Sequence, residues 1–194
     1  MENNQVLLVH GIFRKQGVFQ KMSAYLTAQG WQVYSFNLEQ NSGKLGLENL
    51  AEQVKEYIDK NFAAKQTINL VGLSMGGIVS RYYVQRLGGR ERVQRFITIS
   101  SPHQGTWMAY VLPFKIYVQM RPGSEFLQDL NRDAAMLEQV NFTSIWTPYD
   151  FIIVPANSSQ LGVGKEIKVS VFAHAMMVRN MKSLQAVADA LKMS

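Results

Sequence analysis

Short apolar runs alternate along the chain with longer stretches whose apolar residues recur at helical spacing. The short runs predict six strands, at residues 5–10, 32–37, 67–73, 93–100, 141–146 and 166–172. The stretches between and after them predict helices at residues 17–29, 47–62, 76–87, 126–139 and 177–191. Because strands that alternate with helices form parallel sheets with both faces covered, the pattern predicts an α/β fold. We expect residues 1–194 to form one domain.

Composition narrows the class of protein. With 47% hydrophobic and 18% charged residues, the chain is not disordered. It has no cysteine, which excludes disulfides, thiol nucleophiles and cysteine-ligated metals. The formal net charge of +6 is compatible with transient contact with an anionic lipid surface. The run Arg81, Arg86, Arg90, Arg92 and Arg95 surrounds one helix end and is interpreted as a solvated face, so nucleic acid is not an expected partner.

The apolar runs and the first residues bear on membrane insertion and targeting. No apolar run reaches the roughly 18 residues that span a bilayer, so we expect no transmembrane segment. The first residues offer no basic region followed by an apolar one, so we expect no signal peptide and a cytoplasmic location.

The strongest motif is Gly72-Leu73-Ser74-Met75-Gly76, which directly follows an expected strand and opens an expected helix. A G-x-S-x-G sequence in this context is typical of a nucleophile elbow. A chain that changes from strand to helix at one residue needs flanks without Cβ bulk, which glycine provides. We therefore predict that Ser74 is a nucleophile; the alternative is a helix N-cap serine in a glycine-rich turn.

A serine nucleophile needs a base, and the chain has 3 histidines. His10 ends an expected strand, and His103 and His174 each follow one. All three lie at carboxyl ends of strands, so their positions alone do not distinguish them. Hydrolases of this architecture carry the serine, the acid and the histidine in that chain order. This order selects His174 as the base.

The acid must lie between Ser74 and His174 in the sequence. Asp150 comes just after an expected strand, at the edge of the sheet where the base is also expected. Asp129 and Asp133 lie in a helical stretch and are interpreted as part of a solvated face. We predict that Asp150 orients the imidazole of His174.

Acyl transfer also needs two backbone donors for the oxyanion. Met75, next after the nucleophile, offers one N–H at the start of a helix. The loop after the first strand offers the other, and we expect it to be the N–H of Ile12, because Gly11 lets that loop come close. His10 is then expected to position this loop through hydrogen bonds to the backbone.

The segment from Trp107 to Met120 is apolar except at Pro113, Lys115 and Gln119. Two interpretations stay open for it. It is either an ordinary packed segment or an acyl-binding wall or lid, within residues of about 105–130. On the second interpretation, Trp107 and Phe114 are the candidate substrate-binding residues.

Several motifs occur together in the chain: Val9-His10-Gly11, Gly72-Leu73-Ser74-Met75-Gly76-Gly77, Ser101-Pro102-His103-Gln104-Gly105-Thr106, Pro122-Gly123-Ser124, Asp150 and His174. With these motifs, the chain resembles small bacterial lipases and esterases, the class-2-like triacylglycerol lipases of the α/β-hydrolase superfamily. The resemblance extends from residue 5 to about residue 192. It implies a compact α/β-hydrolase fold with a mostly parallel six-stranded sheet and helices on both faces.

The resemblance also implies hydrolysis of carboxylic esters, with a triad of Ser74, Asp150 and His174 and oxyanion donors at Ile12 and Met75. The working hypothesis is a serine ester hydrolase that acts on lipid-like or apolar acyl esters without metal or cofactor. Two alternatives stay open. One is an acyltransferase or thioesterase that uses the same triad. The other is a non-catalytic scaffold that binds an apolar ligand or a partner.

Overall fold

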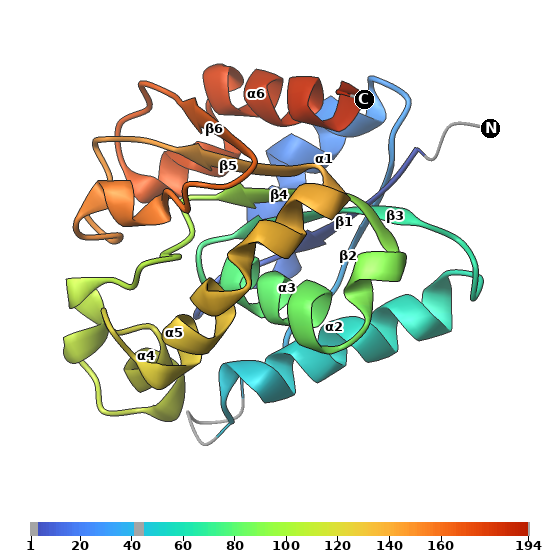
Figure 1. The fold of residues 1–194 in the computed structure, drawn as a ribbon. Helices are drawn as coiled ribbons and strands as arrows, with labels where there is room; N and C mark the ends of the chain where they lie inside the picture. Colours follow the sequence, from blue (N-terminus) through green and yellow to red (C-terminus); the bar gives the residue numbers. More distant parts are fainter. Residues whose placement is uncertain (1–3, 41–44, 194) are drawn as a thin grey trace.

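The six expected strands form one sheet in the structure, a computed structural model that describes residues 4–40 and 45–193. The strand order is β2-β1-β3-β4-β5-β6, and every neighbouring pair is parallel (Figure 1). The strands are β1 (Gln5–Val9), β2 (Gln32–Ser35), β3 (Ile68–Leu73), β4 (Val93–Ile99), β5 (Phe142–Trp146) and β6 (Lys165–Lys168). The predicted α/β fold is confirmed. Residues 1–3, 41–44 and 194, which belong to the single domain expected from the sequence, lie outside the described residues.

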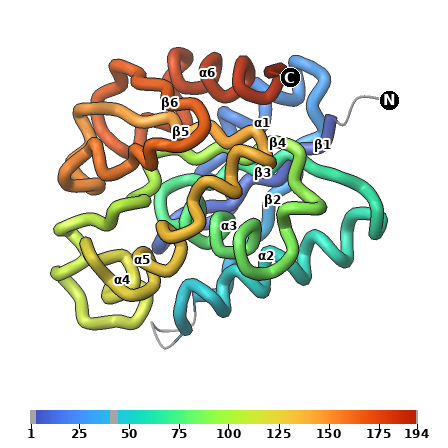
Figure 2. Tube along the Cα trace, in the orientation of Figure 1, coloured from blue at the N-terminus to red at the C-terminus, as the bar shows by residue number. Residues whose placement is uncertain are grey.

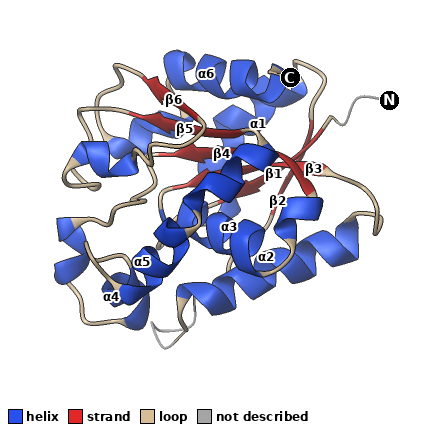
Figure 3. Cartoon of the chain, viewed as in Figure 1, coloured by secondary structure: helices blue, strands red, loops and turns tan. Residues whose placement is uncertain are grey.

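Helices cover both faces of the sheet (Figure 3). They are α1 (Gln20–Thr27), α2 (Leu47–Asn61), α3 (Met75–Arg86), α4 (Lys115–Gln119), α5 (Glu125–Arg132) and α6 (Met181–Lys192). Helices α2, α3 and α5 pack on one face, and α1 and α6 pack on the other (Figure 1). Among the described residues, no helix combines the length and the apolar composition needed to cross a membrane.

The strand β1 shows why the sheet core forms. Leu7 and Val9 pack towards α2 and α3, whereas Val6 and Leu8 pack towards α1 and α6. All of these side chains are buried. Because successive side chains of a strand point to opposite faces, a strand covered on both sides must be apolar throughout. This explains why β1 appears in the sequence as an apolar run.

Several of the predicted boundaries are wrong. The strand expected at 166–172 ends at Lys168, and the helix expected at 17–29 is α-helical only at Gln20–Thr27, after a 3₁₀ helix at Gln16–Phe19. The last helix begins at Met181, not at residue 177, because the Asn180 side chain accepts a hydrogen bond from the Lys182 amide and caps the helix there. The preceding residues, His174–Val178, form a short 3₁₀ turn. The expected helix at 126–139 also divides, since α5 ends at Arg132 and a 3₁₀ helix follows at Ala134–Val140.

The interpretation of the arginine run as a solvated face is wrong for Arg81. This side chain is fully buried, and burial lowers the pKa of its guanidinium to about 9. Its guanidinium donates to Gln85 Oε1, Asn131 Oδ1 and the Leu130 carbonyl at 2.7, 2.8 and 2.6 Å. Arg86 forms ion pairs with Asp129 and Asp133 at 2.9 and 2.7 Å. Both arginines therefore tie α3 to α5.

The long connections after β4 and β5 extend to the same side of the molecule (Figure 2). The N-terminus and the start of β1 lie at the opposite side of the molecule (Figure 1). The parallel strands therefore run towards the side of these connections. In open parallel sheets, ligands bind at the carboxyl ends of the strands. The fold thus places the loops after β1, β3, β5 and β6 around one possible site.

Candidate active site

Ser74 occupies the sharp turn between β3 and α3. Its backbone angles are φ 55° and ψ −126°, a sparsely populated conformation for a residue with a side chain. A Cβ on Gly76 would overlap the carbonyl oxygen of Val9, and one on Gly72 would lie 2.5 Å from the Cα of Gly77. The strand, the turn and the helix can pack this closely only with glycine at these positions. The motif therefore folds locally as the sequence predicted.

His174 and Asp150 form a hydrogen-bonded pair at the ends of the neighbouring strands β6 and β5. The Nδ1 of His174 lies 2.8 Å from Oδ2 of Asp150, whose side chain is only 1% exposed. The other carboxylate oxygen, Oδ1, accepts the amides of Ile152 and Ile153, both at 2.9 Å. Because an ionised carboxylate only accepts, Nδ1 carries the proton and Nε2 is free to take another.

The surroundings of Asp150 keep this carboxyl ionised. Burial by itself raises its pKa. The hydrogen bond and the charge of His174, together with the amides of Ile153 and Ile152, outweigh that effect and lower the pKa below its ordinary value. The pair is thus built to hold a negative charge next to the imidazole.

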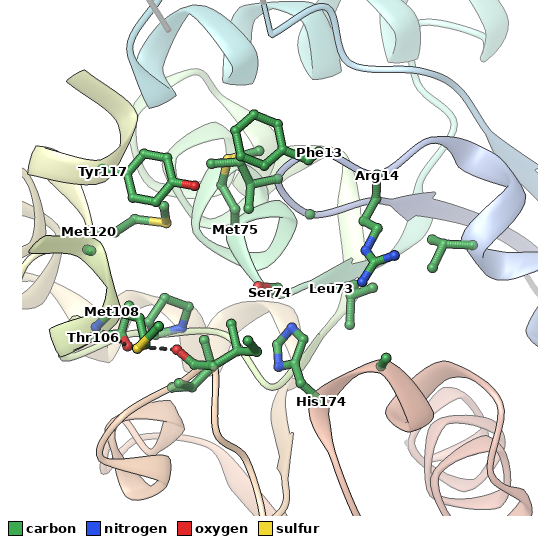
Figure 4. Close-up of a pocket in the computed structure, with 18 of the residues that line it drawn as sticks. Phe13, Arg14, Leu73, Ser74, Met75, Thr106, Met108, Tyr117, Met120 and His174 are labelled. Carbon is green, nitrogen blue, oxygen red and sulfur yellow. Dashed lines mark hydrogen bonds between the residues drawn. The ribbon is translucent and has the colours of Figure 1, made fainter. Parts of the chain in front are cut away.

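Ser74 and His174 line the same cavity, which has a volume of about 520 Å³. Figure 4 shows the imidazole of His174 and the Ser74 turn on the same side of this space. Asp150 stands behind His174, so the structure brings the three predicted residues together at the carboxyl edge of the sheet. The other two histidines are elsewhere, because neither His10 nor His103 lines the cavity.

Ile12 and Met75 also line this cavity. Met75 is the first residue of α3, where backbone N–H groups have no partner within the helix. In the part of the chain that the structure describes, no backbone or side-chain acceptor is bonded to either amide. Two donors are therefore left for a ligand at the positions that the sequence indicated.

His10 holds the loop that carries Ile12. Its Nε2 accepts the Leu38 amide at 2.9 Å, so the proton is on Nδ1, which donates to the Gly11 carbonyl at 2.9 Å. Burial lowers the pKa of His10, although the bond to Gly11 opposes this effect, and the ring therefore stays neutral at pH 7. These backbone contacts match the positioning role expected for His10.

Gln40 also binds this loop through its side chain, and the sequence analysis did not predict it. Its amide group donates to the Gly11 carbonyl at 3.2 Å, and its Oε1 accepts the Phe13 amide at 3.0 Å. The Gly11 carbonyl and the Ile12 N–H belong to one planar trans peptide and point in opposite directions. Fixing the carbonyl therefore fixes the direction of the N–H. No motif surrounds Gln40, so the sequence offered no signal for it.

His103, the remaining histidine, has a structural environment. It is fully buried, and its Nε2 lies 3.0 Å from the Thr98 hydroxyl. Burial lowers the pKa of His103 well below its ordinary value, so the ring stays neutral. Its ring also meets the Phe142 ring edge-on at 5.6 Å between centroids. These contacts are those of a core residue between α5 and the sheet.

The apolar segment 107–120 supplies one wall of the cavity (Figure 4), but Trp107 and Phe114 do not line it. Trp107 is 59% exposed and stacks on Tyr110. Pro113 separates a short 3₁₀ helix, Trp107–Tyr110, from α4, so the segment is not one continuous helix with a single apolar face. Phe114, directly before α4, is 40% exposed. The lining residues of the segment are Met108, Ala109, Val111, Tyr117 and Met120.

Proteins that hold a strained serine between a strand and a helix of a parallel sheet in this way are α/β-hydrolases. This chain is an α/β-hydrolase of the lipase, esterase and thioesterase type. A family model described as palmitoyl protein thioesterase matches residues 5–121, more than half of the chain. The chain belongs to this palmitoyl protein thioesterase family.

Solved structures share the fold. Bacillus licheniformis lipase BlEst2 in its mature form has a TM-score of 0.79 at 13% identity, over 98% of this chain and 93% of the lipase. Aspergillus fumigatus lipase B has a TM-score of 0.81 at 20% identity over 99% of this chain, which spans 53% of that lipase. The thioesterase domain from the curacin biosynthetic pathway has a TM-score of 0.68 at 13% identity, over 99% and 92% of the two chains. The resemblance to lipases and esterases of this superfamily is thereby confirmed.

Proposed function

We propose that the protein is a serine hydrolase that cleaves lipid-like or apolar acyl esters through an acyl-enzyme. One observation carries the proposal. The Asp150-bound imidazole of His174 borders the same apolar cavity as the strained Ser74. A structural serine would not need this strain, and a structural histidine would not need a buried carboxylate at one nitrogen with the other left free.

In the proposed reaction, the Ser74 hydroxyl attacks the acyl carbonyl while Nε2 of His174 takes its proton. Asp150 stabilises the imidazolium as it forms. The amides of Ile12 and Met75 bind the oxyanion of the tetrahedral intermediate. His174 then gives the proton to the leaving alcohol. It next takes a proton from water, which attacks the acyl-serine. The imidazolium then gives its proton to the Ser74 oxygen as the acid is released.

A thioester is the second candidate substrate. The family match and the thioesterase domain among the similar structures favour it. Ester and thioester differ in the leaving group, and both lead to the same acyl-serine, so the two activities can share this site.

Transient contact with a lipid surface is part of the proposal. Phe13 and Val111 line the cavity and are 70% and 65% exposed. Large apolar side chains exposed beside a ligand cavity are typical of membrane or partner contact. The net charge of +6 favours an anionic surface.

Covalent labelling with an alkyl p-nitrophenyl phosphonate tests the nucleophile, since such phosphonates react with activated serines. We expect one adduct, located at Ser74 by peptide mass spectrometry, and parallel turnover of p-nitrophenyl butyrate and a butyryl thioester. The ratio of the two rates decides between ester and thioester. A folded protein that neither reacts with the phosphonate nor turns over either substrate would leave only the non-catalytic scaffold.

The Met108→Ala variant is expected to shift chain-length preference. Met108 lines the cavity and is partly exposed, so its loss removes apolar contact with a long acyl chain and leaves the core intact. Burying a methionine side chain is worth about 1.5–3 kcal/mol, so partial contact predicts roughly a tenfold loss of kcat/KM for octanoate. The kcat/KM for the acetate ester should fall less than about twofold.

Met181→Ala is the matched control, because Met181 is exposed and lies outside the cavity. Equal losses on both esters would contradict an acyl wall at Met108.

The Gln40→Ala variant is expected to lower kcat about tenfold with little change in KM. The Ile12 N–H would lose its alignment but remain present, and removing an oxyanion donor outright costs about 10²–10³. Gln66→Ala is the control, since Gln66 also accepts a backbone amide, that of Ala63 at 3.2 Å, but at the opposite edge of the sheet. A Gln40→Ala enzyme with unchanged kcat would show that the loop holds its orientation without this side chain.

A further inference from the structure

The lining of the cavity contains two arginines. Arg14 lies on the loop after β1, and Arg179 lies between the His174 turn and α6. Apart from His174, the other lining residues are apolar or bear only hydroxyl groups. In the ranges 4–40 and 45–193, no carboxylate forms an ion pair with either guanidinium. The cavity therefore carries two positive charges without acidic partners.

The two sides of the cavity differ in character. The apolar wall of the 107–120 segment, with Tyr117 and Met120, lies on one side of Ser74 (Figure 4). The Arg14 side chain lies on the other side and turns its guanidinium towards Leu73 and the Ser74 turn. Arg179 follows in the segment that carries His174. The charge of Arg14 thus lies away from the acyl wall, and Arg179 contributes a second charge to the cavity lining from the segment that carries the base.

The position of the base assigns a role to each side. In the proposed mechanism, His174 protonates the leaving group, so the leaving group must lie on its side of the scissile bond. The acyl chain then lies along the apolar wall. Arg14 and Arg179 are left to meet the alcohol or thiol part of the substrate.

We propose that Arg14 and Arg179 form a subsite for a phosphate group carried by the leaving alcohol or thiol. The preferred substrates are then apolar acyl esters or thioesters with a phosphorylated leaving group. Guanidinium groups match phosphate because they remain charged and donate in a planar fork. A cleft with apolar walls also strengthens the field of these charges. This inference rests on the proposed function, since it assigns the leaving-group half of that site.

Phosphate beside an acyl bond occurs in two chemical settings, a glycerophosphate ester and a phosphopantetheine thioester. Two matched pairs separate them. One pair is 1-butyrylglycerol and 1-butyrylglycerol 3-phosphate, and the other is S-butyrylpantetheine and S-butyryl-4′-phosphopantetheine. Within each pair the members differ only in the phosphate. The readout is the ratio of their kcat/KM values, which cancels any general loss of activity.

We expect the wild-type enzyme at low ionic strength to favour the phosphorylated member of at least one pair about tenfold or more. The pair that shows the preference identifies the source of the phosphate. The Arg14→Gln/Arg179→Gln double variant should bring that ratio close to one. Because both guanidinium groups are exposed to solvent, added salt should also reduce the ratio.

Arg90→Gln is the matched control. Arg90 is exposed and lies before β4, at the end of the sheet opposite the cavity. The Arg90→Gln change removes one positive charge, as each single change in the double variant does, and should keep the ratio. Wild-type ratios near one in both pairs would overturn the subsite. An Arg90→Gln variant that loses the ratio as fully as the double variant would overturn it too, since a general charge effect would then suffice.

If the wild-type enzyme hydrolyses no ester or thioester, the proposed function fails and a binding measurement decides on the subsite. The Ser74→Ala variant is titrated by calorimetry with 1-palmitoylglycerol 3-phosphate and with 1-palmitoylglycerol. Tighter binding of the phosphorylated ligand, lost on adding Arg14→Gln and Arg179→Gln, would support the subsite. Equal affinities would overturn it.

Discussion

Replacing Ser74 with alanine is expected to lower kcat for ester hydrolysis by about 10⁶, because loss of the nucleophile removes the acyl-enzyme route. The fold should remain, since alanine adds no atom to the crowded turn between β3 and α3. The strain at φ 55° also remains, so the melting temperature should change little. Steady-state hydrolysis of p-nitrophenyl butyrate measures kcat, and a thermal melt measures the melting temperature.

Ser80→Ala is the control for this experiment. Ser80 lies further along α3, is fully buried, and its hydroxyl has no hydrogen-bond partner among the described residues. Removing an unpartnered hydroxyl leaves no acceptor or donor stranded, so both activity and stability should stay close to wild type. Activity of folded Ser74→Ala above a tenth of wild type would place the nucleophile elsewhere.

The features that could be predicted from the sequence are those whose physical cause is local. The turn at Ser74 needs glycine at Gly72 and Gly76, and these residues are visible in the chain as a motif. The parallel sheet was predictable for a similar reason. Strands buried on both faces are mostly apolar and rich in β-branched residues, so they stand out from the amphipathic helices around them.

The features that the sequence did not reveal depend on which distant segments meet. Arg81 looks like a surface residue in the chain. Only the packing of α5 supplies the Leu130 carbonyl and the Asn131 Oδ1 that accept hydrogen bonds from its guanidinium. Gln40 likewise acquires its position from the loop at Gly11, which is distant in the sequence. A side chain without a local motif gives no warning of such contacts.

The cavity wall illustrates a third case. Trp107 and Phe114 were the natural choices within an apolar segment, because large rings offer the most contact area. The break at Pro113 decides which side chains face inwards, and Met108 and Tyr117 take that place instead. Helix propensity predicts neither the direction of two such short helices nor the cavity that they border.

The Asp150→Asn variant tests the hydrogen-bonded pair of Asp150 and His174. Oδ1 of Asp150 accepts two backbone amides, so the oxygen of an asparagine should stay there and its NH₂ group should face Nδ1 of His174. The imidazole must then accept at Nδ1 and carry its proton on Nε2, where it cannot take the proton of Ser74. The same substitution in a serine-protease triad lowers kcat about 10⁴-fold, and we expect a similar loss here.

Asp189→Asn is the control. Asp189 is exposed on α6, so this change removes the same charge and should leave kcat unchanged. An Asp150→Asn enzyme that keeps its kcat would mean that His174 needs no ionised partner and that another group selects its tautomer.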